Sequence, residues 1–102
     1  MDKQINGFNI HVNEEGYMTD LNEWNEVVAR EIAHEEGIEL ENKHFEVLKY
    51  LQDQYRHEVP LTIRKVGKSG VVDIKGFYEL FPGGPLKKAS KIAGIPKPAS
   101  CI

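Results

Sequence analysis

Residues 8–12 alternate apolar and polar side chains, a pattern that is typical of a strand with one buried face. The Asn-Glu-Glu-Gly stretch that follows has the composition of a turn, and Tyr17 and Met18 can begin a return strand. These positions predict a β-hairpin at the N-terminal end of the fold.

The middle of the chain changes to helical spacing. A first amphipathic helix is indicated by four apolar residues, Trp24, Val27, Val28 and Ile32, with Thr19, Asp20 and Asn22 as candidate caps and Gly37 as a stop. A second helix is expected from about Asn42 to His57, and its apolar positions are Phe45, Leu48, Leu51 and Tyr55. The neighbouring Tyr50 is also expected to contact the core.

Prolines and glycines divide the second half into shorter helices. A third helix, opened by Pro60, carries Leu61, Ile63 and Val66 and ends near Gly67 and Gly70. A fourth is expected over residues 74–81. A fifth begins at Pro85, the last residue of the Pro-Gly-Gly-Pro block, and continues to Ala93. The prediction is a mostly α (α+β) fold, a small bundle of about five helices with an N-terminal hairpin.

The segment after Ala93 is not expected to be helical. Pro96 and Pro98 each lack a backbone N–H, and each favours extended geometry in the residue before it. We therefore expect residues 1–93 to form one globular domain and residues 94–102 to form a mobile, extended arm. In that arm the residues that lead to the only cysteine, Cys101, are Gly94, Ile95, Pro96, Lys97 and Pro98.

Cys101 is the main candidate for chemistry. Cysteine is usually buried, whereas a residue near the end of such an arm is hard to bury in the domain's own core. An exposed thiol risks oxidation and cross-linking, so its position indicates either a thiol that reacts with another molecule or a frayed tail that contains a cysteine by chance. Roughly eight extended residues at about 3.1 Å each would give the thiol a reach of about 25 Å.

Composition and charge narrow the class of protein. With 102 residues and 40% hydrophobic content, one core is expected. One cysteine cannot form an internal disulfide, and no apolar run has signal-peptide or membrane length, so we expect a cytoplasmic protein without a membrane partner.

The net charge of −3 is unevenly distributed along the chain. Residues 1–59 carry five Lys/Arg and fourteen Asp/Glu, whereas residues 60–102 carry eight and two. Together with Lys97, three lysines before the arm, Lys87, Lys88 and Lys91, could favour the thiolate of Cys101. The acidic surface, for example at Glu35 and Glu36, could dock a basic partner or could simply be solvated.

Other chemistries find less support. The four histidines, His11, His34, His44 and His57, are scattered, so we expect no metal site and no cofactor. The Gly-Lys-Ser-Gly stretch at 67–70 lacks the spacing of a phosphate loop. The second and third helices around Pro60 could form a DNA-binding helix-turn-helix with Arg64, Lys65 and Lys68, but the acidic first half weighs against direct nucleic-acid binding.

The C-terminal third resembles a known family. The stretch Leu80-Phe81-Pro82-Gly83-Gly84-Pro85, the stretch Lys91-Ile92-Ala93-Gly94-Ile95-Pro96-Lys97-Pro98 and Cys101 resemble the signature of the DsrC/TusE family of sulfur-trafficking proteins. Weaker similarity extends upstream through Trp24, residues 36–40, His44-Phe45 and Tyr55. The resemblance implies a small helical domain with a hairpin and a mobile arm. It also implies that Cys101 accepts a sulfane sulfur as a persulfide and passes it on.

Ser90 departs from one branch of that family. The resemblance implies that DsrC proteins, which work with dissimilatory sulfite reductase, carry a second cysteine at this position, and a serine cannot close a disulfide or trisulfide. The single-cysteine pattern is similar to TusE, which implies a TusBCD-like sulfur donor, an MnmA-like thiouridylase as acceptor, and thiouridine formation in tRNA. The alternative is a gamma-type subunit or regulator of a sulfite reductase.

Overall fold

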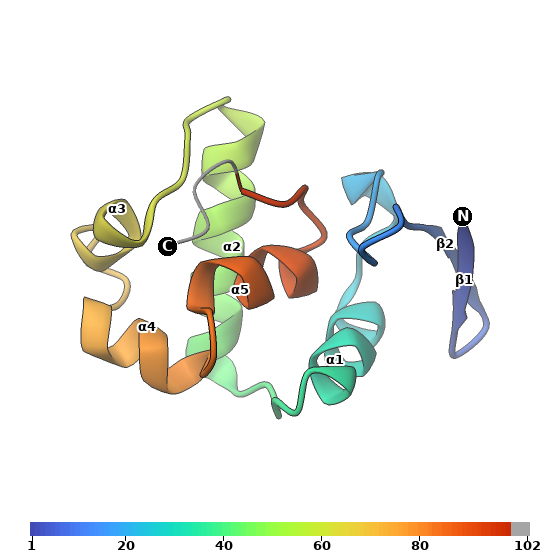
Figure 1. The fold of residues 1–102 in the computed structure, drawn as a ribbon, viewed down its shortest axis with the longest axis horizontal. Coiled ribbons are helices and arrows are strands. Elements are labelled where there is room, and N and C mark those ends of the chain that lie inside the picture. Colours follow the sequence, from blue (N-terminus) through green and yellow to red (C-terminus); the bar gives the residue numbers. More distant parts are fainter. Residues whose placement is uncertain (99–102) are drawn as a thin grey trace.

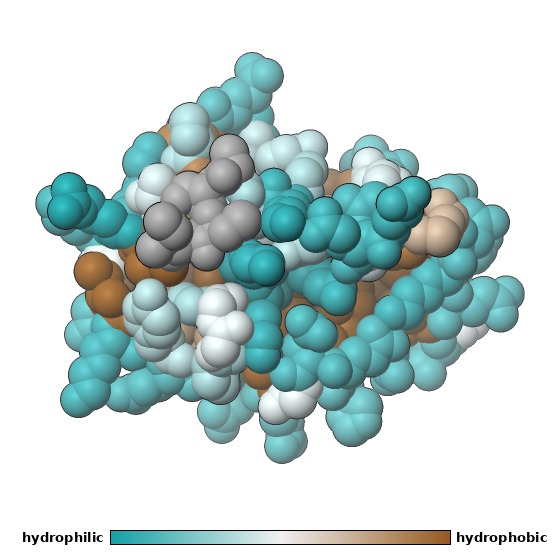
Figure 2. Space-filling model, viewed as in Figure 1, coloured by the Kyte–Doolittle hydropathy of each residue, from teal (hydrophilic) through white to brown (hydrophobic). Residues whose placement is uncertain are grey.

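The computed structural model describes residues 1–98, which form an antiparallel hairpin followed by five α-helices (Figure 1). The hairpin and α1 lie at one end of the long axis, and α3 and α4 lie at the other. Helix α5 lies between these ends and packs against α1, α2 and α4. Hydrophilic side chains cover most of the face in view (Figure 2). The mostly helical fold that the sequence predicts is confirmed.

The hairpin consists of β1 (Asp2–Ile5) and β2 (Phe8–His11), with Ile5 opposite Phe8. Asn6 and Gly7 connect the strands with φ of 47° and 88°, the left-handed pair that a tight type I′ turn requires. The predicted strand at 8–12 is therefore confirmed.

The main partner of this strand is β1, which precedes it and which the sequence analysis did not predict. The predicted return segment is no regular strand, but Met18 forms an antiparallel bridge with Val12. The N–H of Asn13 donates to the carbonyl of Tyr17 at 2.8 Å, and the N–H of Thr19 donates to that of His11 at 3.0 Å. Asn13 holds the intervening turn, since its side-chain oxygen accepts hydrogen bonds from the backbone N–H groups of Glu15 and Tyr17, both at 3.0 Å.

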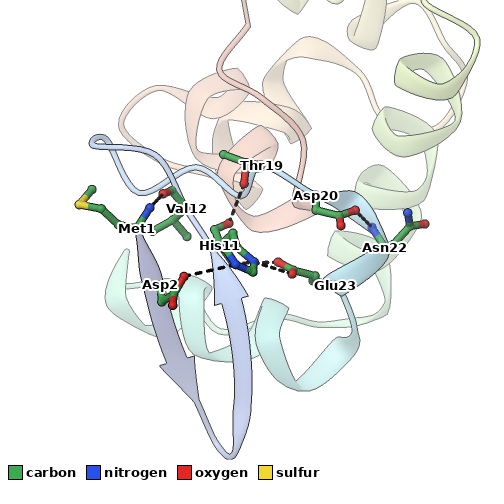
Figure 3. A network of polar contacts seen from close by, with 8 residues as sticks. All are labelled: Met1, Asp2, His11, Val12, Thr19, Asp20, Asn22 and Glu23. Atoms are coloured by element: carbon green, nitrogen blue, oxygen red, sulfur yellow. Dashed lines mark hydrogen bonds and ion pairs between the residues drawn. The ribbon is translucent and has the colours of Figure 1, made fainter.

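His11 attaches the hairpin to the next segment, the short 3-10 helix η1 (Leu21–Glu23) (Figure 3). Its ring Nδ1 lies 2.7 Å from a carboxylate oxygen of Glu23, and its Nε2 lies 3.3 Å from a carboxylate oxygen of Asp2. The hydrogen bond with Glu23, then the charges of Glu23 and Asp2, raise the pKa of His11. The backbone N–H of His11 also donates to Glu23, and this bond is the main reason that the pKa of Glu23 is lowered.

Helix α1 (Glu26–Glu35) begins later than the sequence predicts. Its cap is Asn25, whose side-chain oxygen accepts the N–H of Val28 at 2.9 Å, whereas Asp20 caps η1. Trp24 therefore lies before the helix. The predicted burial of Val27 was also wrong: its side chain is 41% exposed, because the buried face of α1 carries Val28, Ala29, Ile32 and Ala33.

Helix α2 (Asn42–Arg56) is capped by a reciprocal pair of contacts between Glu41 and His44. His44 is buried, and its Nε2 bonds the carbonyl of Leu80 at 2.9 Å, which ties the start of α2 to the end of α4. Tyr55, expected in the core, is 43% exposed. The apolar stripe ends one turn earlier, where Leu51 and Gln52 are buried.

The remaining helices are α3 (Ile63–Gly67), α4 (Ile74–Leu80) and α5 (Pro85–Ala93). Pro60 does not open α3, because Thr62 caps it by accepting the N–H of Lys65 at 3.0 Å. Pro85 does occupy the first position of α5, as predicted. In the described residues no helix is long and apolar enough to cross a bilayer.

Candidate functional site at the end of helix α5

Helix α5 carries three of the predicted site residues, Lys87, Lys88 and Lys91, and has two distinct faces. One face is fully packed into the core and consists of Pro85, Leu86, Ala89, Ser90, Ile92 and Ala93. The other face carries Lys87, Lys88 and Lys91, whose spacing places them on one side of the helix. One face of the helix therefore packs into the core, and the other forms a basic surface.

The three lysines line one groove of about 270 Å³, together with Glu15, Tyr17, Glu36 and Gly83. We call this surface the basic groove. The ammonium group of Lys91 lies 3.9 Å from a carboxylate oxygen of Glu36, and the Tyr17 hydroxyl donates to the carbonyl of Lys87 at 3.4 Å. Two carboxylates thus face three ammonium groups, which leaves the lining with net positive charge.

Lys97 connects the predicted arm to the basic groove. Its ammonium group lies 2.9 Å from a carboxylate oxygen of Glu15, one of the groove's lining residues. The pair is largely exposed, and exposed pairs of this kind contribute about 0–1 kcal/mol. The contact therefore places Lys97 beside the groove without fixing it there strongly.

The base of the predicted arm is buried. Gly94 adopts φ of 78°, and a Schellman turn follows, in which Gly94 donates to the carbonyl of Lys91 and Ile95 donates to that of Ser90. The side chain of Ile95 is only 1% exposed and belongs to the core. Pro96 and Lys97 are the first residues of this segment to be exposed.

Two side chains from distant elements bond the last carbonyls of α5. The Trp24 indole N–H donates to the carbonyl of Ile92, and the Gln52 side-chain amide donates to the carbonyl of Ala93, both at 2.8 Å. The sequence analysis missed the role of Gln52. A signal was present, because Gln52 follows Leu48 by one turn and so shares the buried face of α2.

Ser90 is fully buried beneath this turn. Its side-chain oxygen has no hydrogen-bond partner among residues 1–98, although its backbone carbonyl accepts the N–H of Ile95. A side chain in this position cannot meet a solvent-borne reagent unless the base of the arm opens.

Cys101 lies outside the described residues. The structure therefore brings together Lys87, Lys88 and Lys91, places Lys97 next to them through Glu15, and buries Gly94 and Ile95 at the end of α5. Glu15 was not among the predicted site residues. Within residues 1–98 no three His, Cys, Asp or Glu side chains lie close enough to hold a metal ion.

Comparisons with known proteins agree with this architecture. The family described as "DsrC like protein" matches residues 4–102. The sulfurtransferase TusE homolog of Haemophilus influenzae is 39% identical, with 96% of this chain and 97% of the relative covered, and TusE of Escherichia coli is 38% identical, with 94% and 95% covered. The solution structure of DsrC from Allochromatium vinosum covers all of both chains at 32% identity, with a TM-score of 0.84.

A second solved structure extends the comparison to a subunit of an enzyme complex. The oxidized gamma-subunit of the dissimilatory sulfite reductase (DsrC) from Archaeoglobus fulgidus covers all of both chains at 31% identity, with a TM-score of 0.82. Sequence and fold lead to the same assignment, and the chain belongs to the DsrC-like family.

Proposed function

We propose that this chain is a sulfur carrier that accepts a sulfane sulfur on Cys101 and relays it toward thiouridine formation in tRNA. The observation that carries the proposal is the extent of the family match, which runs to residue 102 and so includes the segment with the chain's only cysteine. Relatives named sulfurtransferase TusE are 38–39% identical over nearly their whole length, and their name supports transfer of the sulfur toward tRNA.

The proposed chemistry has two balanced steps. The thiolate of Cys101 attacks the terminal sulfur of a donor persulfide, the donor S–S bond breaks, and the donor leaves as a thiolate. Cys101 then holds the sulfur as its own persulfide. An acceptor thiolate attacks that terminal sulfur, and Cys101 is regenerated as the thiolate. No external oxidant or reductant is consumed.

Residues 94–102 form the delivery arm in this proposal. Pro96 and Pro98 restrict the backbone after the buried base, which limits the orientations that must be lost when Cys101 enters a partner. The basic groove and Lys97 would receive an acidic rim around the partner's entrance, and their charge would favour the thiolate of Cys101.

The proposed partners are a TusBCD-like donor complex and an MnmA-like thiouridylase, and transfer toward tRNA places the chain in the cytoplasm. A sulfite reductase is the second candidate partner, because three similar solved structures are named for dissimilatory sulfite reductase or its gamma subunit. Ser90 favours the first pair of partners, since its buried hydroxyl cannot form a disulfide with Cys101.

Intact-mass spectrometry tests the proposal directly. After incubation with a persulfide donor, the natural protein should gain the mass of one sulfur atom, and the Cys101→Ser variant should gain none. The loaded protein is then mixed with the thiouridylase or with the sulfite reductase. Loss of the added sulfur only with the thiouridylase supports the relay to tRNA, whereas equal mass gains in both forms would refute the assignment of Cys101.

A further inference from the structure

The last four carbonyls of α5 are all hydrogen-bonded, in two different ways. A helix leaves the carbonyls of its last turn without intrahelical partners. The Schellman turn uses those of Ser90 and Lys91. Those of Ile92 and Ala93 receive the side chains of Trp24 and Gln52.

These two donors come from parts of the chain far from α5. Trp24 lies between η1 and α1, 68 positions before its acceptor, and Gln52 lies on α2, 41 positions before its own. Gln52 is only 6% exposed, and Ile92 and Ala93 are fully buried. Water therefore cannot readily replace either donor, and the end of α5 is held from two sides.

We propose that Trp24 and Gln52 are positioning residues, which fix the direction in which the arm leaves the domain and so set where Cys101 can be presented. The inference rests on the proposed function, because it concerns delivery of the sulfur held on Cys101. Neither side chain takes part in the chemistry. Each acts through the backbone of α5.

The physical argument concerns the orientations of the arm. Glycine itself has wide conformational freedom, and the backbone at Gly94 is restricted by the burial of Ile95, by the turn and by the two side-chain bonds. If the carbonyl of Ala93 loses its donor, the last turn of α5 can open locally and the arm samples more directions. A smaller fraction of encounters with a protein acceptor is then productive, because ordering a loose segment is part of the free-energy cost of binding. A small thiol has no such requirement.

The test compares Gln52→Met, which keeps the size of the side chain but removes the donor, with Val66→Ala, a buried change on α3 that loses stability away from the arm. Each protein is loaded with sulfur on Cys101 and mixed with the thiouridylase or with dithiothreitol, under conditions where circular dichroism shows both variants to be folded. Backbone ¹⁵N relaxation at Ile95 and Lys97 is measured in the same samples.

For Gln52→Met we expect kcat/KM with the thiouridylase to fall by roughly fivefold, with kcat less affected, and the order parameters of Ile95 and Lys97 to fall. The rate with dithiothreitol should stay at the parental value, and Val66→Ala should change none of these quantities. Trp24→Phe should act in the same direction as Gln52→Met.

Unchanged order parameters and an unchanged kcat/KM in Gln52→Met would overturn the inference, as would equal losses in Val66→Ala. If the parent protein itself takes up no sulfur, the proposed function fails, whereas the relaxation data still decide whether Gln52 restrains the arm.

Discussion

The hydroxyl of Ser90 is sealed in the core without a partner among residues 1–98. A buried hydroxyl that makes no hydrogen bond loses its hydration without compensation. Ser90→Ala removes that oxygen and should raise the free energy of unfolding by about 1 kcal/mol, measured by urea denaturation. Sulfur transfer should change by less than about tenfold, a barrier change of about 1.4 kcal/mol.

The neighbouring alanine provides a matched control for this prediction. Ala89 is also fully buried on α5, so Ala89→Ser places a hydroxyl where none is accommodated and should lower stability by about 1–3 kcal/mol. If Ser90→Ala proved destabilising, the Ser90 hydroxyl would have to make a favourable contact that the described residues do not contain.

His11 makes the attachment of the hairpin dependent on pH. A histidine whose pKa is raised on folding stabilises the fold in its protonated form, so its contribution is complete below the usual value of about 6.5 and is lost as pH rises through the raised pKa. For Glu23, whose pKa is lowered, the contribution is present above about 4.5 and is lost as pH falls through the lowered pKa. The pair is therefore strongest between these limits.

An NMR titration of the His11 ring checks this prediction. In the natural protein its pKa should lie above about 6.5, and Glu23→Gln should move it back toward that value, with a residual increase from Asp2. Glu26→Gln, on the first turn of α1, is the control and should leave the titration of His11 unchanged. An equal shift in the two variants would show that the general acidity of this region, rather than the contact with Glu23, controls the ring.

At the scale of elements, two helices end in the same kind of turn with different surroundings. Gly37 after α1 and Gly94 after α5 have φ of 76° and 78°, and both precede a residue that bonds back into its helix. A Cβ on Gly37 would meet no atom within 4 Å, whereas one on Gly94 would lie 2.8 Å from a carbon of the Trp24 ring. Only the second turn is closed by packing.

This contrast predicts two different costs for the same substitution. Gly37→Ala should lose about 1–2 kcal/mol, the price of a left-handed alanine. Gly94→Ala should lose a further amount of about 1–3 kcal/mol, because the methyl group displaces Trp24. Urea denaturation of both variants measures the difference. Equal losses of stability in the two variants would mean that the Trp24 ring moves aside at little cost and does not restrain the end of α5.

The helices were predictable because their signals are local. Pro85 and the Pro-Gly-Gly-Pro block marked the start of α5. The three lysines that the sequence analysis grouped before the arm line one groove in the structure. The sequence analysis paired the strand at 8–12 with the residues after it, because the next turn signal that it used was the Asn-Glu-Glu-Gly stretch. The Asn6-Gly7 pair, a strong signal for a two-residue turn, was overlooked.

Other features depended on contacts between distant parts of the chain. The sequence analysis named three candidate caps for α1, but the residue that caps this helix is a fourth, Asn25. Trp24 consequently lies outside the helix, where its indole N–H donates to the carbonyl of Ile92. The pairing of Glu15 with Lys97 spans 82 positions. Local periodicity carries no information about such partners, so the surroundings of the arm could not be predicted in detail.

At the scale of the whole molecule, we predict that the arm is an active part of delivery. Replacing both Pro96 and Pro98 by glycine should leave the fold intact, because Pro96 is exposed and Pro98 only partly buried. Transfer to a protein acceptor should nevertheless slow, since the variant has more backbone freedom to lose. Circular dichroism and transfer rates with subsaturating acceptor measure the two effects, and an unchanged rate would show that the arm is a passive tether.

The charge of the arm is tested separately. Lys97→Glu should slow transfer at low salt, and the difference from the parent should shrink as salt is added, because screening weakens attraction to an acidic entrance. Lys75→Glu, an exposed change of the same charge on α4, is the control. If both variants slowed transfer equally, net charge rather than the position of Lys97 would control the encounter.

The uneven charge of the sequence becomes an electric dipole along the 36 Å axis of the folded chain. Residues 1–41, with two Lys/Arg and eleven Asp/Glu, lie toward the hairpin end. Residues 60–80, with four Lys/Arg and two Asp/Glu, lie toward the other end, where α3 and α4 are (Figure 1). In dilute salt a charged partner would exert a torque that turns the matching end toward it before contact. At physiological ionic strength the field decays over about 8 Å, much less than this axis, so each end interacts independently. One molecule could then engage a basic and an acidic partner without the two competing for the same surface.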